Sequence, residues 1–287
     1  MSEPILLDGA QVAKALRAEV AARTTVLKEQ YGITPGLAAV LAGDNPASVT
    51  YVSMKRKACA KAGIASFEHV FSSDATQEEV MACVRALNAN PHVHGILVQH
   101  PMPKHLDEDE ILATVDPAKD VDGIGRASLG DLVLGHPSFV SCTPQGMMTL
   151  LARYGIDPTG KHAVVVGRSV ILGKPMAIAL LNANATVTIC HSKTKNLAEL
   201  TRQADILVAA VGRPEMITGE MLKPGVVVLD AGYNRVEGRG RDVGDCHFES
   251  CAALASAITP VPGGVGPMTI ATLLEQTVQA AERVAGL

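Results

Sequence analysis

The stretch Ala163–Pro175, AVVVGRSVILGKP, decides the fold that this sequence predicts. Its four apolar residues at 163–166 predict a buried strand, Gly167 opens a turn, and Gly173 begins a helix. A strand, a glycine turn and a helix N-terminus together form a place that holds a phosphate, because backbone N–H groups at the helix start point toward it. The stretch therefore predicts a nucleotide-binding unit built on a parallel sheet.

The turn in this stretch departs from the strict glycine fingerprint of dinucleotide-binding proteins. Gly167 and Gly173 fit the two ends of the fingerprint, but Ser169 occupies the position of its middle glycine. Arg168 and Ser169 instead offer a cation and a hydroxyl as donors to a phosphate. We therefore expect an NADP-binding turn.

The end of the next strand decides between NAD and NADP. In this kind of fold an acidic residue there binds the ribose hydroxyls and repels a 2′-phosphate. Here the strand 186–190 runs into His191-Ser192-Lys193-Thr194, which has no carboxylate and three side chains able to donate to a phosphate. The pattern favours NADP, with Arg168 approaching from the first turn; the alternative is a solvated polar turn that binds nothing.

Strands and helices alternate along the whole chain, which is typical of parallel sheets covered by helices. The expected strands are 36–42, 66–71, 95–99, 163–166, 186–190, 206–211 and 226–230, with a short apolar segment near Ile258. The expected helices are 9–30, 48–62, 77–88, 143–154, 174–183, 196–203 and about 268–285. Residues 116–135 are rich in Asp and Gly and predict an irregular connection or site loop.

These elements predict an α/β protein of two domains. We expect an N-terminal α/β parallel-sheet domain over 1–142 and a Rossmann-like NADP-binding domain over 143–267, with the active-site cleft between them. The C-terminal helix, about 268–287, is expected to return to the first domain.

The composition excludes several classes of function. The chain has 287 residues, 47% of them hydrophobic and 19% charged, as an ordinary globular protein does. Its net charge is −4 and it has only four Tyr and four Phe, so the cationic face and stacking aromatics of a nucleic-acid-binding protein are missing. No apolar run approaches the roughly 20 residues of a membrane span, and the N-terminus does not resemble a signal peptide.

The cysteines and histidines predict neither a disulfide framework nor a metal site. The six cysteines form no CxxC pair, and several lie in apolar surroundings, which favours buried reduced thiols in a cytoplasmic protein. His92 and His94 share one side of a possible strand, but no third ligand is near them in the sequence.

Four polar residues stand out as candidates for chemistry. Tyr51 and Lys55 are four residues apart on a predicted helix and share a face, although the pair taken alone is more typical of a solvated surface face. Gln99 closes the apolar strand GILVQ, which suggests a side chain aimed into a cleft. Asp122, within Lys119-Asp-Val-Asp-Gly123, can pair with a ring N–H or amino group of a heterocycle, or simply form an Asx turn.

Seven segments together resemble the bifunctional methylenetetrahydrofolate dehydrogenase/cyclohydrolase family of the bacterial FolD type. They occur in the order of the family, between about residues 51 and 274: YVSMKRKACAKAGI, GILVQHPMP, KDVDGIG, CTPQGMMTLL, GRSVILGKP, CHSKT and PVPGGVGPMTIATLL. The resemblance implies oxidation of 5,10-methylenetetrahydrofolate by NADP, then hydrolysis of the methenyl product to 10-formyltetrahydrofolate, by a homodimer joined through its nucleotide domains.

The resemblance also implies roles for individual residues. Lys55 would be the essential amine of the hydrolysis, Gln99 would hydrogen-bond it and tune its charge, Tyr51 would stack on the aminobenzoate ring and Asp122 would hold the pterin. The remaining implied contacts are the folate-lining loop 262–270, with Pro262, Gly263 and Gly264, and the NADP contacts Gly167, Arg168, Ser169, Ser192 and Tyr233.

The sequence departs from the family pattern at three places. His100 stands where a leucine is common, Ile124-Gly125-Arg126 replaces Phe-His-Pro beside the proposed pterin contact, and Val170 replaces a frequent Asn. One alternative is a dehydrogenase with impaired hydrolysis, and an alternative of a different class is a protein that binds NADP without turnover. A dehydrogenase of amino or hydroxy acids would leave the KDVDG and PGGVGP segments unexplained.

Overall fold

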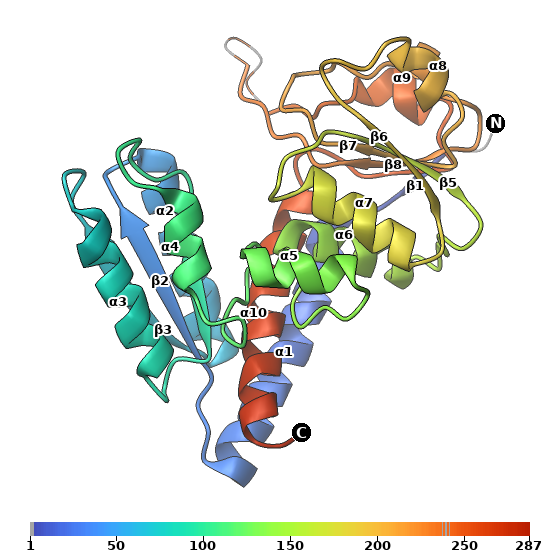
Figure 1. Ribbon diagram of the computed structural model, residues 1–287. Helices are drawn as coiled ribbons and strands as arrows, with labels where there is room; N and C mark the ends of the chain where they lie inside the picture. The colour runs from blue at the N-terminus through green and yellow to red at the C-terminus, as the bar shows by residue number, and fades with distance from the viewer. Residues whose placement is uncertain (1–2, 237, 239, 241) are drawn as a thin grey trace. The chain divides into compact units, whose positions relative to one another are not determined.

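The computed structural model describes residues 3–236, 238, 240 and 242–287. The chain divides into two compact units (Figure 1). The six-stranded unit comprises residues up to Ala13 together with Thr143–Thr269, and the three-stranded unit comprises Lys14–Cys142 together with Ile270–Leu287. The first and last long helices therefore contribute residues to both units.

The six-stranded unit is an entirely parallel sheet with the strand order β1-β9-β8-β7-β5-β6. Its strands are β1 (Ile5–Leu6), β5 (His162–Val166), β6 (Thr186–Cys190), β7 (Ile206–Ala209), β8 (Val227–Asp230) and β9 (Ala257–Ile258). Its helices are α6 (Cys142–Arg153), α7 (Gly173–Asn182), α8 (Leu197–Thr201), η1 (Gly219–Met221) and α9 (Phe248–Ala252).

Alternate side chains of these strands fill two apolar layers. Val165 and Val208 point into a layer that they share with α6 and α7, whereas Val164 and Leu207 point into a layer shared with α9. The helices accordingly lie on the two faces of the sheet (Figure 1). Strands buried on both faces must be apolar throughout, which is why the runs AVVV and ILVA are continuous rather than alternating.

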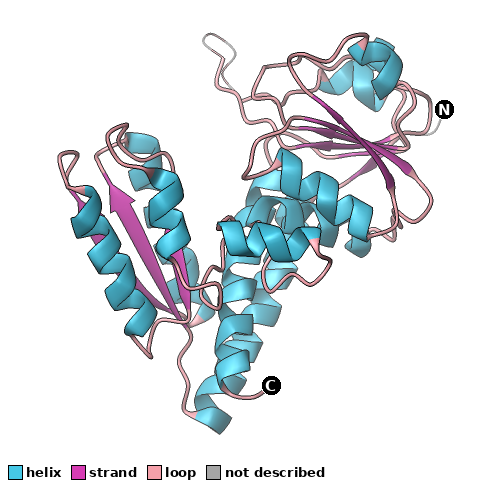
Figure 2. Cartoon of the chain, viewed as in Figure 1, coloured by secondary structure: helices cyan, strands magenta, loops and turns pink. Residues whose placement is uncertain are grey.

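The three-stranded unit is a smaller parallel sheet with the order β3-β2-β4. Its strands are β2 (Gly36–Ala42), β3 (Ala65–Phe71) and β4 (Gly95–Val98). Its helices are α1 (Gly9–Tyr31), α2 (Pro46–Ala62), α3 (Gln77–Ala89), α4 (Glu108–Thr114), α5 (Arg126–Val133) and α10 (Val265–Val284), of which α1 and α10 begin in the other unit. Figure 2 shows how much of the chain is helical.

The two faces of this sheet also bury different residues. Ala38 and Val40 of β2 pack against α3 and α4, whereas Leu37 and Leu41 pack against α1, α2 and α10. Helices α1 and α10 lie side by side (Figure 1), and Arg23 joins them through an ion pair of 2.6 Å with Glu282. This helical layer bears directly on the site, because α2 carries Tyr51 and Lys55.

The structure departs from the sequence expectations in three ways. Helices α4, α5 and α9 and the short η1 were not expected, and α5 lies inside the segment 116–135 expected to be irregular. Gly130 in α5 weakens its helical pattern. Strand β1 has two residues, too few to show a periodicity. Residues up to Ala13, expected in the N-terminal domain, cluster with the six-stranded unit, where Leu7 N–H donates to Ile258 O at 2.9 Å.

Candidate functional site

Lys55 and Gln99 meet in the three-stranded unit. Gln99 follows β4, and its N–H donates to Val40 O at 2.9 Å, so the sheet fixes its backbone. Its side chain is buried, 8% exposed, and Oε1 accepts a hydrogen bond of 3.1 Å from Lys55 Nζ on α2. The other end of the amide donates to His100 O at 2.8 Å, which orients Oε1 toward the amine. The structure thus brings together two residues that are 44 positions apart.

The Lys55 amine lies in an environment that disfavours its charge. Burial lowers the pKa of Lys55, because removal of the ammonium group from water disfavours its charged form. The negative charge of Asp122 acts in the opposite direction and raises this pKa, but burial is the larger effect. A lysine with a lowered pKa loses its proton at a lower pH than an ordinary lysine, so its free amine can accept and return a proton during a reaction.

Two thiols share this environment and stay protonated. Burial raises the pKa of Cys59 to about 12 and raises that of Cys142 as well. All six cysteines are free, and five of them are buried. Protonated thiols leave Asp122 as the negatively charged partner of Lys55.

Within the KDVDG segment, the structure separates supporting residues from the candidate site residue. Lys119 Nζ donates to three carbonyls at the end of α3, including Asn88 O at 2.7 Å. The buried Asp120 carboxylate accepts from Gly123 N–H, Gly125 N–H and Ser128 Oγ, at 3.1, 2.9 and 2.5 Å. The Asx-type turn considered for Asp122 is therefore made by Asp120, and Asp122 is the one whose charge acts on Lys55.

Tyr51 lies one turn before Lys55 on α2, and 45% of it is exposed. A phenol that shares a helix face with the amine and remains accessible offers an aromatic surface beside it. The structure places Tyr51, Lys55, Gln99 and Asp122 in the same unit, whereas Pro262, Gly263 and Gly264 lie in the other.

In the six-stranded unit, β5, its turn and α7 are packed too closely for any side chain at two glycines. Gly167 has a φ of 144°, and a Cβ there would lie 2.2 Å from Ala210 O, which follows β7. A Cβ at Gly173 would lie 2.4 Å from Gly167 O. The sheet order reverses at β5, whose neighbours are β6 and β7, and this is where nucleotides bind in such folds.

Three more of the predicted nucleotide contacts lie in this turn and in the turn after the neighbouring strand β6. Arg168, Ser169 and Ser192 are all exposed. Ser169 Oγ accepts from Gly173 N–H at 3.3 Å, so it tightens the start of α7. After β6, His191 N–H donates to Thr194 Oγ1 at 2.8 Å, which closes the carboxylate-free turn. These groups fit a nucleotide with an extra phosphate, because backbone approach and cationic or hydroxyl donors are both present.

Two buried carboxylates that sequence reasoning missed support the turns at this edge of the sheet. Asp245, fully buried, accepts from the N–H groups of Val211, Gly212 and Arg213 at 2.6 to 2.9 Å. Asp230 accepts from Gly232, Asp245 and Cys246, and burial raises its pKa to about 6 against these donors. No local pattern distinguishes these aspartates from surface ones.

Tyr233, which the family resemblance makes an NADP contact, is 62% exposed. It follows the Gly232 turn, and its hydroxyl hydrogen-bonds to Asp242. The turn itself is held by Asn234, whose side chain donates to Asp245 Oδ1 at 2.9 Å.

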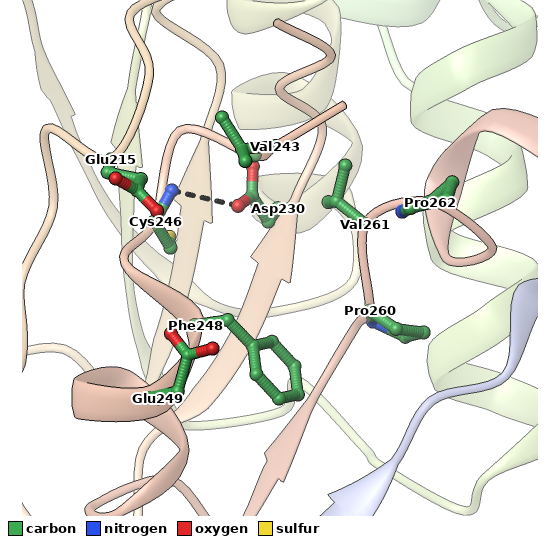
Figure 3. A pocket seen from close by; sticks show the side chains of 10 residues that line it. Glu215, Asp230, Val243, Cys246, Phe248, Glu249, Pro260, Val261 and Pro262 are labelled. Carbon is green, nitrogen blue, oxygen red and sulfur yellow. Dashed lines mark hydrogen bonds between the residues drawn. The ribbon is translucent and has the colours of Figure 1, made fainter. Parts of the chain in front are cut away.

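A pocket of about 260 Å³ lies beside the ends of β8 and β9 (Figure 3). Asp230, Phe248 and Pro262 are among the residues that line it. The loop after β9 is tightly folded, since a Cβ at Gly264 would lie 2.6 Å from Pro260 O. The loop after β9, which contains Gly263, Gly264 and Gly266, therefore borders a cavity of the six-stranded unit through its residues 260–262.

The described residues contain no group of three His, Cys, Asp or Glu side chains that could hold a metal ion. Among the described residues, no helix is both long enough and apolar enough to cross a membrane.

A parallel sheet with a glycine turn at its switch point, joined to a second α/β unit with a buried amine, defines a nucleotide-dependent two-domain enzyme. Two family models match: the catalytic domain of tetrahydrofolate dehydrogenase/cyclohydrolase over residues 7–122, and its NAD(P)-binding domain over 141–285. The chain belongs to this family.

Individual relatives agree with the family models. Bifunctional protein FolD of Moorella thermoacetica is 55% identical over 278 residues, which is 97% of this chain and 99% of the relative. The crystal structure of the bifunctional enzyme FolD from Campylobacter jejuni is 48% identical, has a TM-score of 0.95 and covers 97% of this chain and 99% of its own. FolD of Trypanosoma brucei, complexed with NADP cofactor and inhibitor, is 38% identical, has a TM-score of 0.95 and covers both chains completely.

Proposed function

We propose that this chain oxidises 5,10-methylenetetrahydrofolate with NADP and hydrolyses the resulting 5,10-methenyltetrahydrofolate to 10-formyltetrahydrofolate. Membership of the dehydrogenase/cyclohydrolase family supports both reactions. The observation that carries the proposal is the contact of 3.1 Å between Lys55 Nζ and Gln99 Oε1, at an amine whose pKa burial lowers. A protein that only binds nucleotide has no use for such an amine.

For the oxidation, the six-stranded unit positions the cofactor. When bound, NADP supplies the hydride acceptor. Gly167 lets the backbone approach the pyrophosphate, while Arg168 and Ser192 hold the 2′-phosphate. Tyr233 and the neighbouring turn, which Asp245 braces, contact the cofactor at the same edge of the sheet. The remaining requirement is proximity between the reacting carbons, which rigid turns favour.

For the hydrolysis, the three-stranded unit supplies the proton chemistry. A water adds to the electrophilic methenyl carbon and must lose a proton as the C–O bond forms. The free amine of Lys55 accepts that proton and passes it to the ring nitrogen that leaves as its C–N bond breaks, while the remaining hydroxyl proton is released to solvent as the formyl C=O forms. Gln99 orients the amine, and the carboxylate of Asp122 binds the N–H groups of the pterin while it favours the protonated lysine.

Substrate binding completes the proposed roles. Tyr51 stacks on the aminobenzoate ring, for which its exposed position one turn from Lys55 is suitable. Pro262, Gly263 and Gly264 line the folate site, and their small, constrained backbone allows a close approach.

A spectrophotometric assay of the purified protein tests the proposal. We expect reduction of NADP with methylenetetrahydrofolate, slower reduction of NAD, and loss of methenyltetrahydrofolate absorbance when that compound is supplied alone. NADP reduction without methenyl hydrolysis would identify a dehydrogenase whose Lys55 site is impaired. If folded protein binds NADP but turns over neither folate, the proposed function is wrong.

We also propose that the protein is a cytoplasmic homodimer joined through its six-stranded units. Six free cysteines suit a reducing compartment. Strand β6 lies at an edge of the sheet, where Ile189 is 42% exposed, as an edge that meets a second copy would be. Sedimentation analysis should give twice the chain mass, and Ile189→Lys should shift it to the monomer.

A further inference from the structure

Gln276, on α10, joins two segments of the three-stranded unit that flank Asp122. Its Nε2 donates to Val121 O at 2.7 Å and to Val140 O at 3.0 Å, and its Oε1 accepts from Val140 N–H at 3.2 Å. Two carbonyl acceptors and one N–H donor fix the orientation of the amide without ambiguity. Gln276 is 4% exposed, so water competes little with these bonds.

The two segments joined by Gln276 are in direct contact around Asp122. Cys142 N–H donates to Asp122 O at 3.2 Å, and Cys142 Sγ donates to Val121 O at 3.3 Å. A Cβ at Gly123 would lie 2.4 Å from the carbonyl carbon of Val140, so the segments cross without spare room. The backbone of Asp122 is therefore bounded on both sides by atoms that Gln276 holds.

Helix α10 holds the second of these segments at another point as well. Arg283 Nη2 donates to Ser138 O at 2.7 Å, and the guanidinium carbon lies 4.3 Å from the centroid of the buried Phe139 ring. The segment 138–142 is thus attached to α10 along two turns, and the hydrogen bond from Gln276 to Val121 O extends that attachment to the segment that carries Asp122.

We propose that Gln276 is a positioning residue that sets the place of the Asp122 carboxylate relative to the Lys55 amine. It touches neither group in the structure, and it acts through the backbone on either side of Asp122. The inference rests on the proposed roles of Lys55 and Asp122 in hydrolysis. It adds a residue that the site itself does not contain.

The test compares Gln276→Leu with Thr277→Val in the full-length protein. Leu keeps most of the volume but none of the hydrogen bonds. Thr277 is equally buried on the same helix, and its hydroxyl donates to Leu273 O of that helix, so Thr277→Val is the matched control. The readouts are methenyltetrahydrofolate hydrolysis at subsaturating and saturating substrate, its pH profile, NADP affinity and thermal stability.

We expect hydrolysis at subsaturating substrate to fall between about tenfold and about a hundredfold in Gln276→Leu, because small displacements of reacting groups cost rates of this size. The rising limb of the pH profile should move to lower pH, because a displaced Asp122 no longer raises the pKa of Lys55. NADP affinity should stay within about twofold of the parent. Thr277→Val should lose stability without moving the pH profile.

If the pH profile of hydrolysis is the same in Gln276→Leu as in Thr277→Val, the proposal is wrong, because a merely structural role of Gln276 predicts equal profiles. If Gln276→Leu does not fold, Gln276→Asn keeps the amide on a stem one methylene shorter, and an unmoved limb there has the same meaning. Failure of the proposed function is distinguishable from failure of this inference. In that case the parent protein does not hydrolyse methenyltetrahydrofolate, or Lys55→Met hydrolyses it at the parent rate, before any Gln276 variant is measured.

Discussion

Replacing Lys55 with Met removes the amine while keeping an unbranched apolar stem of similar length. Gln99 Oε1 then loses the hydrogen bond of 3.1 Å that Lys55 Nζ donates, and the Asp122 carboxylate loses the ammonium charge of Lys55. If Lys55 relays the proton during hydrolysis, the loss should equal the contribution of a positioned general base, which is about a hundredfold to about ten-thousandfold in rate. The variant should therefore hydrolyse methenyltetrahydrofolate about a hundredfold to about ten-thousandfold more slowly than the parent protein.

The same substitution should leave the fold intact. Burial lowers the pKa of Lys55, so below that pKa the folded state carries a protonation penalty that the unfolded chain lacks. The penalty is relieved as pH rises from the lowered pKa to the ordinary value of 10.5. Met removes this penalty and forfeits a hydrogen bond of about 1 kcal/mol. The two effects oppose each other, so the thermal midpoint should change little near neutral pH.

The assay follows the loss of methenyl absorbance over a range of pH, in parallel with thermal unfolding. In the parent, the rate should rise with pH as the amine loses its proton and then level off. Lys57→Met is the matched control, because Lys57 is exposed on the same helix. Hydrolysis by folded Lys55→Met at the rate of the Lys57→Met control would refute the role assigned to Lys55.

Two further predictions concern the six-stranded unit. Arg168→Ala should weaken NADP binding by about tenfold to a hundredfold, as loss of a charge-assisted contact does, and leave NAD binding unchanged; a titration that finds both affinities equally affected would contradict the 2′-phosphate assignment. Asp230→Asn should lower the unfolding free energy by about 1–3 kcal/mol, since one amide oxygen cannot accept from all three backbone donors of Asp230. Because burial raises the pKa of Asp230 from 3.8 to about 6, its contribution to stability falls as pH rises through that window. Urea unfolding at several pH values should show this fall in the parent and not in Asp230→Asn, and equal slopes would mean that Asp230 titrates normally.

Local patterns predicted the elements that bury continuous apolar runs. Strands β2 and β5 were predicted from GLAAVLA and AVVV, because a strand covered on both faces needs apolar residues throughout. Helix α5 was missed because its sequence, RASLGDLV, has no strong helical period and contains a glycine. Its position depends on Asp120, whose carboxylate accepts from Gly125 and Ser128 at the start of the helix.

The site residues also divide into those that a local pattern predicts and those that only the folded chain shows. Gln99 was predicted from its place at the end of an apolar strand, and the structure gives it the lysine partner that the family resemblance implied. Gln276 could not have been found, because its bonds to Val121 and Val140 span 155 and 136 residues. In the sequence it is one more polar residue in a long helix, and only the folded chain shows that both faces of that helix are buried there.

The most direct test of the proposed function follows both reactions in one sample of the parent protein. Methylenetetrahydrofolate and NADP are mixed with the enzyme, and NADPH and methenyltetrahydrofolate are recorded together over time. We expect NADPH to accumulate while the methenyl compound stays below it and is converted to 10-formyltetrahydrofolate faster than in buffer. NADPH formation with methenyltetrahydrofolate accumulating in equal amount, and decaying only at its rate in buffer, would contradict a hydrolytic role for the Lys55–Gln99 pair.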